Sequence, residues 1–439
     1  MKDIVHGYLP DERPGFGKLI VFALQQILVM FPATVLVALL TGFHVSTTIF
    51  ASGFATLVFI FFTKGKIPLY YGSSFSYIAA IVGITGAKFG VPASDALISQ
   101  AQFGIIMSGF VSIVAGLIVS RFGLDKIEKV LPPSVTGSIA IVIGISLAGV
   151  AVTNAASNGG GEILDINWIA ALVTLIATIV FSVYLKGVWS QVPILLGILV
   201  GYGVSFALGM VNLSTIFAGN IIQVPHFTFP SVSWPAVIAI MPIAIATIPE
   251  STAHLFQLDI YVNDLAKKKG KGELDIKNKL GLNLMGDGLG DIVSAMIGGP
   301  AGTNYGENLS TMAITKNFSV WVLGAAAVIT MIISFFSPLT GLVTSIPSSV
   351  INGACIYLFG IIGAQGVAIM IERKVDLFDS KNLAVIATIL TIGLGGTYGF
   401  AGGMIPFFGT QLPAIATASL FGIVLNLVLS LRKDHSQVE

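Results

Sequence analysis

Residues 19–41 read LIVFALQQILVMFPATVLVALLT, and this stretch decides the class of fold. It contains 23 residues and no charged side chain. A helix needs roughly 20 apolar residues to cross the hydrocarbon core of a bilayer. The run is also longer than the apolar centre of a signal peptide, so we expect a permanent transmembrane helix.

The rest of the chain has the same character. Of the 439 residues, 55% are apolar and only 10% are charged, and the mean hydropathy is +0.92. Ordinary soluble domains contain about 25% charged residues, so these figures exclude both a soluble enzyme and a disordered chain. The sequence therefore predicts an all-α protein that crosses the membrane many times.

Few residues are of the kinds that catalytic or metal centres use. The single cysteine, Cys355, excludes a disulfide framework and a cysteine-based metal cluster. No pair of the five histidines has the spacing of metal ligands, and no nucleophile–base motif is present. We predict no enzymatic activity, no metal and no cofactor.

Fourteen transmembrane segments are predicted from the apolar runs. They cover residues 19–41, 46–63, 67–86, 98–120, 133–152, 167–185, 191–212, 235–258, 280–298, 304–315, 318–337, 346–371, 383–399 and 409–431. The third and tenth segments are short, and small polar residues interrupt both of them.

The basic residues agree with this count. If the N-terminus lies in the cytoplasm, all 22 lysines and arginines except Lys88 fall on the cytoplasmic side, as the positive-inside rule requires. We therefore expect a multi-pass protein of the cytoplasmic (inner) membrane with both termini inside. The lysine-rich run 267–271 is interpreted as a solvated loop, with no nucleic-acid partner.

Two similar stretches indicate an internal repeat. Residues 132–135 (PPSV) and 347–350 (PSSV) each precede an apolar run, and they lie about half the chain apart. Each repeat then holds seven segments, and an odd number forces the second copy to lie inverted in the bilayer. Inverted repeats are typical of secondary transporters, which bind substrate near the midplane between discontinuous helices.

The two interrupted segments are each third in their repeat. They contain residues 71–77 (YGSSFSY) and 302–308 (GTNYGEN). Irregular backbone occurs at membrane depth only inside protein or beside a cavity, and half-helices there direct free N–H groups at a ligand. The sequence therefore predicts a central pocket that includes Ser74, Phe75, Tyr305 and Gly306.

Charged side chains inside the predicted segments are the strongest candidates for function. Glu250 and Glu307 lie within segments that contain no lysine or arginine to pair with them. His254 follows Glu250 by four residues and shares its helix face, so the two can exchange a proton. We predict that both glutamates bind the substrate, and that Glu250 with His254 carries the coupling proton.

Three further polar residues are possible cavity-lining residues. Asp287 and Asp291 share one face of the ninth segment, where they line the cavity or accept backbone N–H bonds from the broken region. Gln26 lies in the first segment, and its alternative role is a helix–helix hydrogen bond.

A compact neutral ring with adjacent N–H donors and C=O acceptors suits two carboxylates, free backbone N–H groups and aromatic rings. Uracil has this pattern, and oxidised purines share it. A small cation also suits two glutamates, whereas an anion would be repelled. The chemistry of the side chains alone leaves these ligands open.

At the same residues the chain resembles the nucleobase–ascorbate transporter family, also called nucleobase:cation symporter-2, and most of all its bacterial uracil permeases. The most specific pieces are Glu250-x-x-x-His254 and the motifs GKIP at 65–68, GSSF at 72–75, YGEN at 305–308 and MAITK at 312–316. The resemblance covers nearly the whole chain. Ser251 departs from it, since uracil permeases usually have histidine there.

The resemblance implies a fold and a mechanism. It implies a core domain formed by residues 1–132 and 235–340, a gate domain formed by 133–234 and 341–439, and short paired β-strands in the third and tenth segments. It also implies that Glu250, Glu307 and the backbone amides of Phe75 and Gly306 contact the base, and that His254 takes part in proton coupling. Family members commonly form homodimers.

The main hypothesis is a proton-coupled importer of uracil that works by alternating access. The alternative within the family is a permease for xanthine or another purine. An alternative of a different class is an anion exchanger or channel on a similar fold, and the acidic pocket argues against it.

Overall fold

The computed structural model describes residues 7–123, 129–157, 164–216, 220–407 and 410–431. Lys2, Lys126, Arg432 and Lys433, which the charge analysis assigned to the cytoplasm, lie outside these ranges. By length and composition, eight described helices can cross a membrane. These are α1 (Phe16–Thr41), α2 (Val45–Phe62), α4 (Asp95–Phe122), α6 (Pro133–Ala156), α7 (Asp165–Tyr184), Trp234–Lys268, α15 (Ser348–Glu372) and α16 (Ser380–Gly399).

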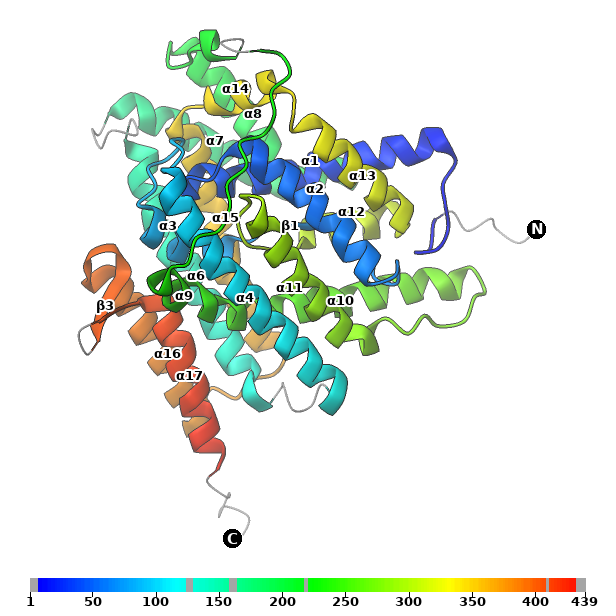
Figure 1. The fold of residues 1–439 in the computed structure, drawn as a ribbon, viewed down its shortest axis with the longest axis vertical. Coiled ribbons are helices and arrows are strands. Elements are labelled where there is room, and N and C mark those ends of the chain that lie inside the picture. The colour runs from blue at the N-terminus through cyan, green and yellow to red at the C-terminus, as the bar shows by residue number, and fades with distance from the viewer. Residues whose placement is uncertain (1–6, 124–128, 158–163, 217–219, 408–409, 432–439) are drawn as a thin grey trace.

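Shorter elements complete the predicted segments (Figure 1). The run Trp234–Lys268 is divided into α9 (Trp234–Ile240), a 3-10 turn (Met241–Ile243) and α10 (Ala244–Lys268). The remaining helices are α3 (Ile78–Thr85), α8 (Pro193–Ala207), α11 (Leu280–Met296), α12 (Gly306–Thr315), α13 (Val320–Ile333), α14 (Ser337–Thr344) and α17 (Ala414–Ser430). They form the 7+7 arrangement that the sequence predicts.

Helix packing follows the symmetry of two inverted repeats. Helix α4, the fourth segment of the first repeat, packs on α11, the second of the other; α2 and α13 make the reciprocal pair. Glycines bring α4 and α11 together: Gly109 faces Gly288, and Gly116 faces Gly281. A Cβ atom on Gly109 would lie 2.5 Å from the Gly288 carbonyl oxygen, so the backbones touch where side chains would separate them.

The third and tenth segments are interrupted by strands, as expected. Strand β1 (Tyr71–Ser73) pairs antiparallel with β2 (Gly302–Asn304), and Gly72 lies opposite Thr303. Both strands are fully buried. Each repeat contributes one strand, so the strand pair forms only when the two halves come together. The Tyr71 N–H and carbonyl, in contrast, bond to hydroxyls of α2, those of Thr56 and Ser52.

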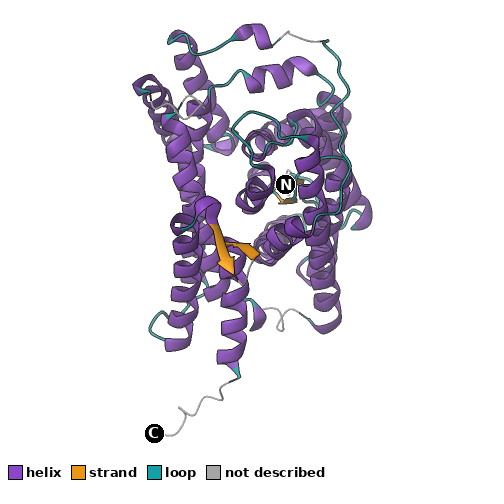
Figure 2. Cartoon of the chain, turned by 60° about the vertical axis from the view of Figure 1, so that its left-hand side comes forward, coloured by secondary structure: helices purple, strands orange, loops and turns teal. Residues whose placement is uncertain are grey.

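Three boundaries differ from the sequence prediction. The fourteenth segment, predicted over 409–431, is helical only from Ala414, because a hairpin of β3 (Met404–Phe407) and β4 (Thr410–Pro413) precedes it (Figure 2). Helix α14 is a separate helix in what was predicted to be a loop and the end of segment eleven. Helix α10 continues about ten residues beyond the predicted end because it leaves the apolar region and ends among lysines.

A long extended segment joins α8 to α9; we call residues 220–233 the strap (Figure 1, green, running toward α9). It is hydrogen-bonded along its length. The Gln223 N–H donates to the Phe335 carbonyl at 2.9 Å, and the Ser231 N–H donates to the Ser99 carbonyl at 2.9 Å. The strap therefore links the two repeats while it lies against helices of both.

The described N-terminal segment is held against residues that follow the C-terminal ends of α10 and α12. The Tyr8 N–H donates to the Lys316 carbonyl at 2.8 Å. Glu12 accepts hydrogen bonds from the amines of Lys269 and Lys271. These contacts fix the start of the chain beside the lysine-rich loop.

Candidate functional site

The two paired strands place two helix N-termini side by side. Directly after β1, Phe75 starts a 3-10 turn that continues into α3, and directly after β2, Gly306 starts α12. The Ser74 N–H donates to the Ala301 carbonyl at 3.0 Å, and the Tyr305 N–H donates to the Tyr70 carbonyl at 2.9 Å. First-turn N–H groups of a helix lack intrahelical partners and carry partial positive charge, so both ends suit carbonyl oxygens of a ligand.

Glu250 and Glu307 lie at this junction. Glu250 follows Pro249, the proline within α10, and Glu307 is the second residue of α12. Glu250 lies close enough to Glu307 for the two carboxyl groups to interact electrostatically, and it lies beside the Ser76 side chain. Both glutamates are only half-buried, so a ligand can reach them.

His254 completes the group. A Cβ atom on Gly306 would lie 2.7 Å from the Nε2 atom of His254, so the imidazole packs directly on the first residue of α12. The Nδ1 atom of His254 is buried without a hydrogen-bond partner. The predicted pair of Glu250 and His254 therefore lies beside both Glu307 and the helix start.

Ser74 and Phe75 occupy different surroundings. The hydroxyl of Ser74 accepts a hydrogen bond from the Ser76 N–H at 3.3 Å, which caps the 3-10 turn. The ring of Phe75 is half-buried and meets Phe359 of α15 edge-on, with 6.3 Å between centroids. Phe75 therefore lies where the interrupted segment contacts α15.

Tyr305 lies behind the strands. Its ring covers Gly72, where any side chain would collide with it. Its hydroxyl donates to the Ser73 carbonyl at 3.0 Å and lies 3.0 Å from the hydroxyl of Thr34. With 3% of its surface exposed, Tyr305 braces β1 from α12 in this structure.

Asp291 and Asp287 support the same strands from α11. The Oδ1 atom of Asp291 accepts the Tyr71 hydroxyl at 2.5 Å and the Gly302 N–H at 2.8 Å. This is the second of the two roles considered above, acceptance of backbone N–H bonds. Asp287 accepts the hydroxyl of Ser251, and both side chains are buried.

Buried amides make further polar contacts near the strands, and of these side chains the sequence analysis singled out only Gln26. Asn308 donates to the side chain of Gln26 at 2.8 Å, which gives Gln26 the helix–helix role. Asn304 donates to Asn283 at 3.1 Å, and Asn283 donates to the Ser251 hydroxyl at 2.8 Å. An amide inside an apolar segment is the signal that could have identified Asn283.

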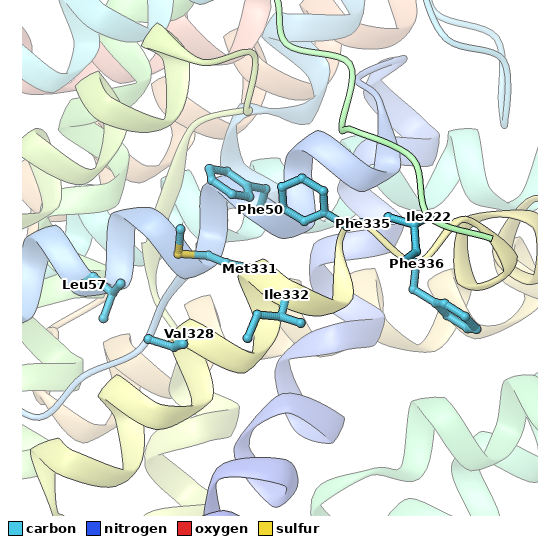
Figure 3. A pocket seen from close by; sticks show the side chains of 8 residues that line it. All are labelled: Phe50, Leu57, Ile222, Val328, Met331, Ile332, Phe335 and Phe336. Carbon is cyan, nitrogen blue, oxygen red and sulfur yellow. The ribbon is translucent and has the colours of Figure 1, made fainter. Parts of the chain in front are cut away.

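Two pockets in the described part of the chain have linings that include neither Glu250 nor Glu307. A cavity of about 620 Å³ is lined by aliphatic, aromatic and methionine side chains of α2, α13, the turn after α13 and the strap (Figure 3). Its lining offers no hydrogen-bonding side chain for a nucleobase. A cavity of about 10 Å³, enough for one water molecule, lies between Ser251, Asp287, Asp291 and Thr303.

The sequence has many curated relatives. A model described as "Permease family" matches residues 17–402. The chain is 38% identical over 434 residues to the uracil permease of Bacillus caldolyticus, covering 97% of this chain and 95% of that protein. It is 35% identical to the uracil permease of Bacillus subtilis, covering 94% and 93%, and 34% identical to that of Escherichia coli K12, covering 96% and 93%.

Solved structures share the fold at low sequence identity. The transmembrane domain of the cyanobacterial bicarbonate transporter BicA matches with a TM-score of 0.58 and 13% identity, over 94% of this chain and 97% of that one. The murine anion transporter Slc26a9, in an inward-facing state, matches with a TM-score of 0.66 and 12% identity, over 96% and 69%. These two establish the architecture, and the sequence relatives establish the family: the chain is a multi-pass membrane protein that belongs to the nucleobase–ascorbate transporter family.

Proposed function

We propose that the protein is a proton-coupled importer of uracil and not an enzyme. The observation that carries this proposal is the meeting of Glu250, Glu307 and His254 with two helix N-termini, in a chain whose relatives are named uracil permeases. The carboxylates accept the N–H groups of the ring, and the amides at Phe75 and Gly306 donate to its carbonyls. An anion fits poorly because two carboxylates face the site.

Coupling to protons follows from the position of His254. The Glu250 carboxyl and the His254 ring lie one helical turn apart and next to Glu307. A proton that enters with the substrate moves one positive charge inward, which contributes about 2.3 kcal/mol per 100 mV of membrane potential. That energy is enough to concentrate a neutral base inside the cell.

Residues 1–132 and 235–340 are proposed as the core domain and residues 133–234 and 341–439 as the gate domain. Alternating access then arises as the gate moves against the core, and the Phe75–Phe359 contact lies on their boundary. We further propose a homodimer in the cytoplasmic membrane with both termini inside. The Lys88→Cys variant should react with an impermeant maleimide added outside intact cells, and the Lys271→Cys variant should not.

The direct test is uptake of radiolabelled uracil into proteoliposomes with and without an inward proton gradient. A charge-assisted hydrogen bond contributes about 1–1.5 kcal/mol more than a neutral one, so Glu307→Gln, which keeps an acceptor oxygen but not the charge, should weaken uracil binding about 10-fold. Glu307→Ala, which removes the acceptor, should abolish binding. Near-normal uptake by Glu307→Ala would refute the site. If xanthine or guanine competes better than uracil, the protein is a purine permease.

The role of His254 has its own test. His254→Leu should impair gradient-driven uptake more than equilibrium binding of uracil, because the imidazole of His254 carries the proton and does not hold the uracil. Binding is measured on purified protein by calorimetry, and uptake in the same proteoliposome assay. Equal loss of both would instead assign His254 a structural role.

A further inference from the structure

Three potential metal ligands from distant parts of the chain meet beside the strap. His44 immediately precedes α2, Asp95 is the first residue of α4, and His226 lies within the strap. One ligand atom from each lies within 4.8 Å of the others. The spacing of histidines along the sequence indicated no such site, because the three residues are separated by dozens of residues or more.

The geometry is close to that of a metal centre. The Nε2 atom of His226 lies 2.9 Å from Asp95 Oδ2, and the Nε2 atom of His44 lies 3.6 Å from Asp95 Oδ1. Ligands at about 2.0–2.2 Å from a tetrahedral zinc ion are about 3.3 Å apart. Shifts of about an ångström or less would therefore bring all three atoms to one ion.

The surroundings hold two of the three residues in place. The hydroxyl of Thr47 donates to the His226 carbonyl at 2.6 Å, and the Thr48 N–H donates to the His44 carbonyl at 2.9 Å. The Nε2 atom of His44 is buried but has no hydrogen-bond partner, although it points at Asp95. A buried imidazole nitrogen without a partner calls for an explanation, and a bound ion is one that the neighbouring Asp95 and His226 side chains suit.

We propose that His44, Asp95 and His226 bind one divalent transition-metal ion, of which Zn²⁺ fits the ligand set best. Two imidazoles and a carboxylate suit zinc and its neighbours, whereas Mg²⁺ and Ca²⁺ prefer oxygen ligands throughout. The side chains of Asp95 and His226 are 60% and 53% exposed, so water can occupy the fourth position. The ion fastens the strap to the starts of α2 and α4.

The test uses full-length protein in detergent, with any affinity tag removed and metals stripped by a chelator. Titration with Zn²⁺ should give one site per chain by calorimetry and should raise the unfolding temperature, because the ion binds the folded state. His226→Ala and Asp95→Asn should each weaken Zn²⁺ binding about 100-fold or more. Asp165→Asn, at an exposed residue at the start of α7, is the matched control and should bind as the wild type does.

Wild-type protein also gives a readout that needs no variant. Co²⁺ in place of Zn²⁺ should produce the visible absorption of a tetrahedral site with nitrogen ligands, and excess Mg²⁺ should not remove it. The proposal is overturned if the wild type shows neither saturable Zn²⁺ binding nor this absorption. It is equally overturned if a folded His44→Ala/His226→Ala double variant binds Zn²⁺ as tightly as the wild type.

Discussion

Replacement of Asp291 should loosen the strand pair on which the site is built. In Asp291→Ala, the Tyr71 hydroxyl and the Gly302 N–H both lose their acceptor, in a region where Tyr71 and Asp291 are at most 2% exposed. A buried donor left without a partner costs about 1–3 kcal/mol, so the two together should destabilise the fold by about 2–6 kcal/mol. Asp291→Asn keeps an oxygen at the same place and should cost much less.

The assay is thermal unfolding of purified protein, paired with calorimetric binding of uracil. Asp291→Ala should unfold at a clearly lower temperature and bind uracil weakly, because Gly302 precedes the start of α12 by only four residues. Tyr71→Phe removes only one of the two hydrogen bonds, so its stability should lie between those of Asp291→Asn and Asp291→Ala. If Asp291→Ala melts and binds like the wild type, the strands do not depend on α11 and the reasoning fails.

Two further predictions concern the contacts of Glu12 with Lys269 and Lys271 and the glycine contact between α4 and α11. Burial raises the pKa of Glu12, but hydrogen bonds from Lys269, the Leu9 N–H and Lys271 outweigh this effect. Together they lower the pKa from 4.5 to about 2. The stability that Glu12 adds over Glu12→Gln should therefore be complete above pH 4.5 and be lost as the pH falls through about 2, as melting curves of both proteins can show. A difference that stays constant with pH would contradict the contacts of Glu12 with the lysines. Gly288→Leu should destabilise the protein by about 1–3 kcal/mol or more, because α4 and α11 are in backbone contact there, whereas Gly324→Leu, with open space around its Cβ position, should melt like the wild type.

Much of the fold could be predicted because a bilayer restricts the possible structures. Apolar runs of about 20 residues mark helices, and the odd number of segments in each repeat dictates the inversion. The hairpin before α17 escaped prediction because residues 404–407 fall in a predicted loop, and residues 410–413 (TQLP) directly precede an apolar run and are predicted as its first turn. Periodicity cannot separate a short strand from a helical turn.

The site could be predicted in part, because unpaired charges in apolar segments are rare. Glu250, Glu307 and His254 stood out for that reason, and the structure brings them together. The sequence analysis placed Tyr305 in the pocket, but the pattern alone does not fix which way its ring points, since an aromatic residue next to a motif either faces the ligand or braces the backbone. The His44–Asp95–His226 cluster was missed because only the folded chain brings these residues together.

The pairing of β1 with β2 also has a consequence for biosynthesis. The ribosome completes Tyr71 long before Asn304, its partner in the register. Until then, the Tyr70 carbonyl and the Ser74 N–H lack their partners, the Tyr305 N–H and the Ala301 carbonyl, so the third segment cannot settle stably among lipids. The nascent first half should therefore stay near the translocon, or be shielded by a chaperone, until the second half supplies the missing strand.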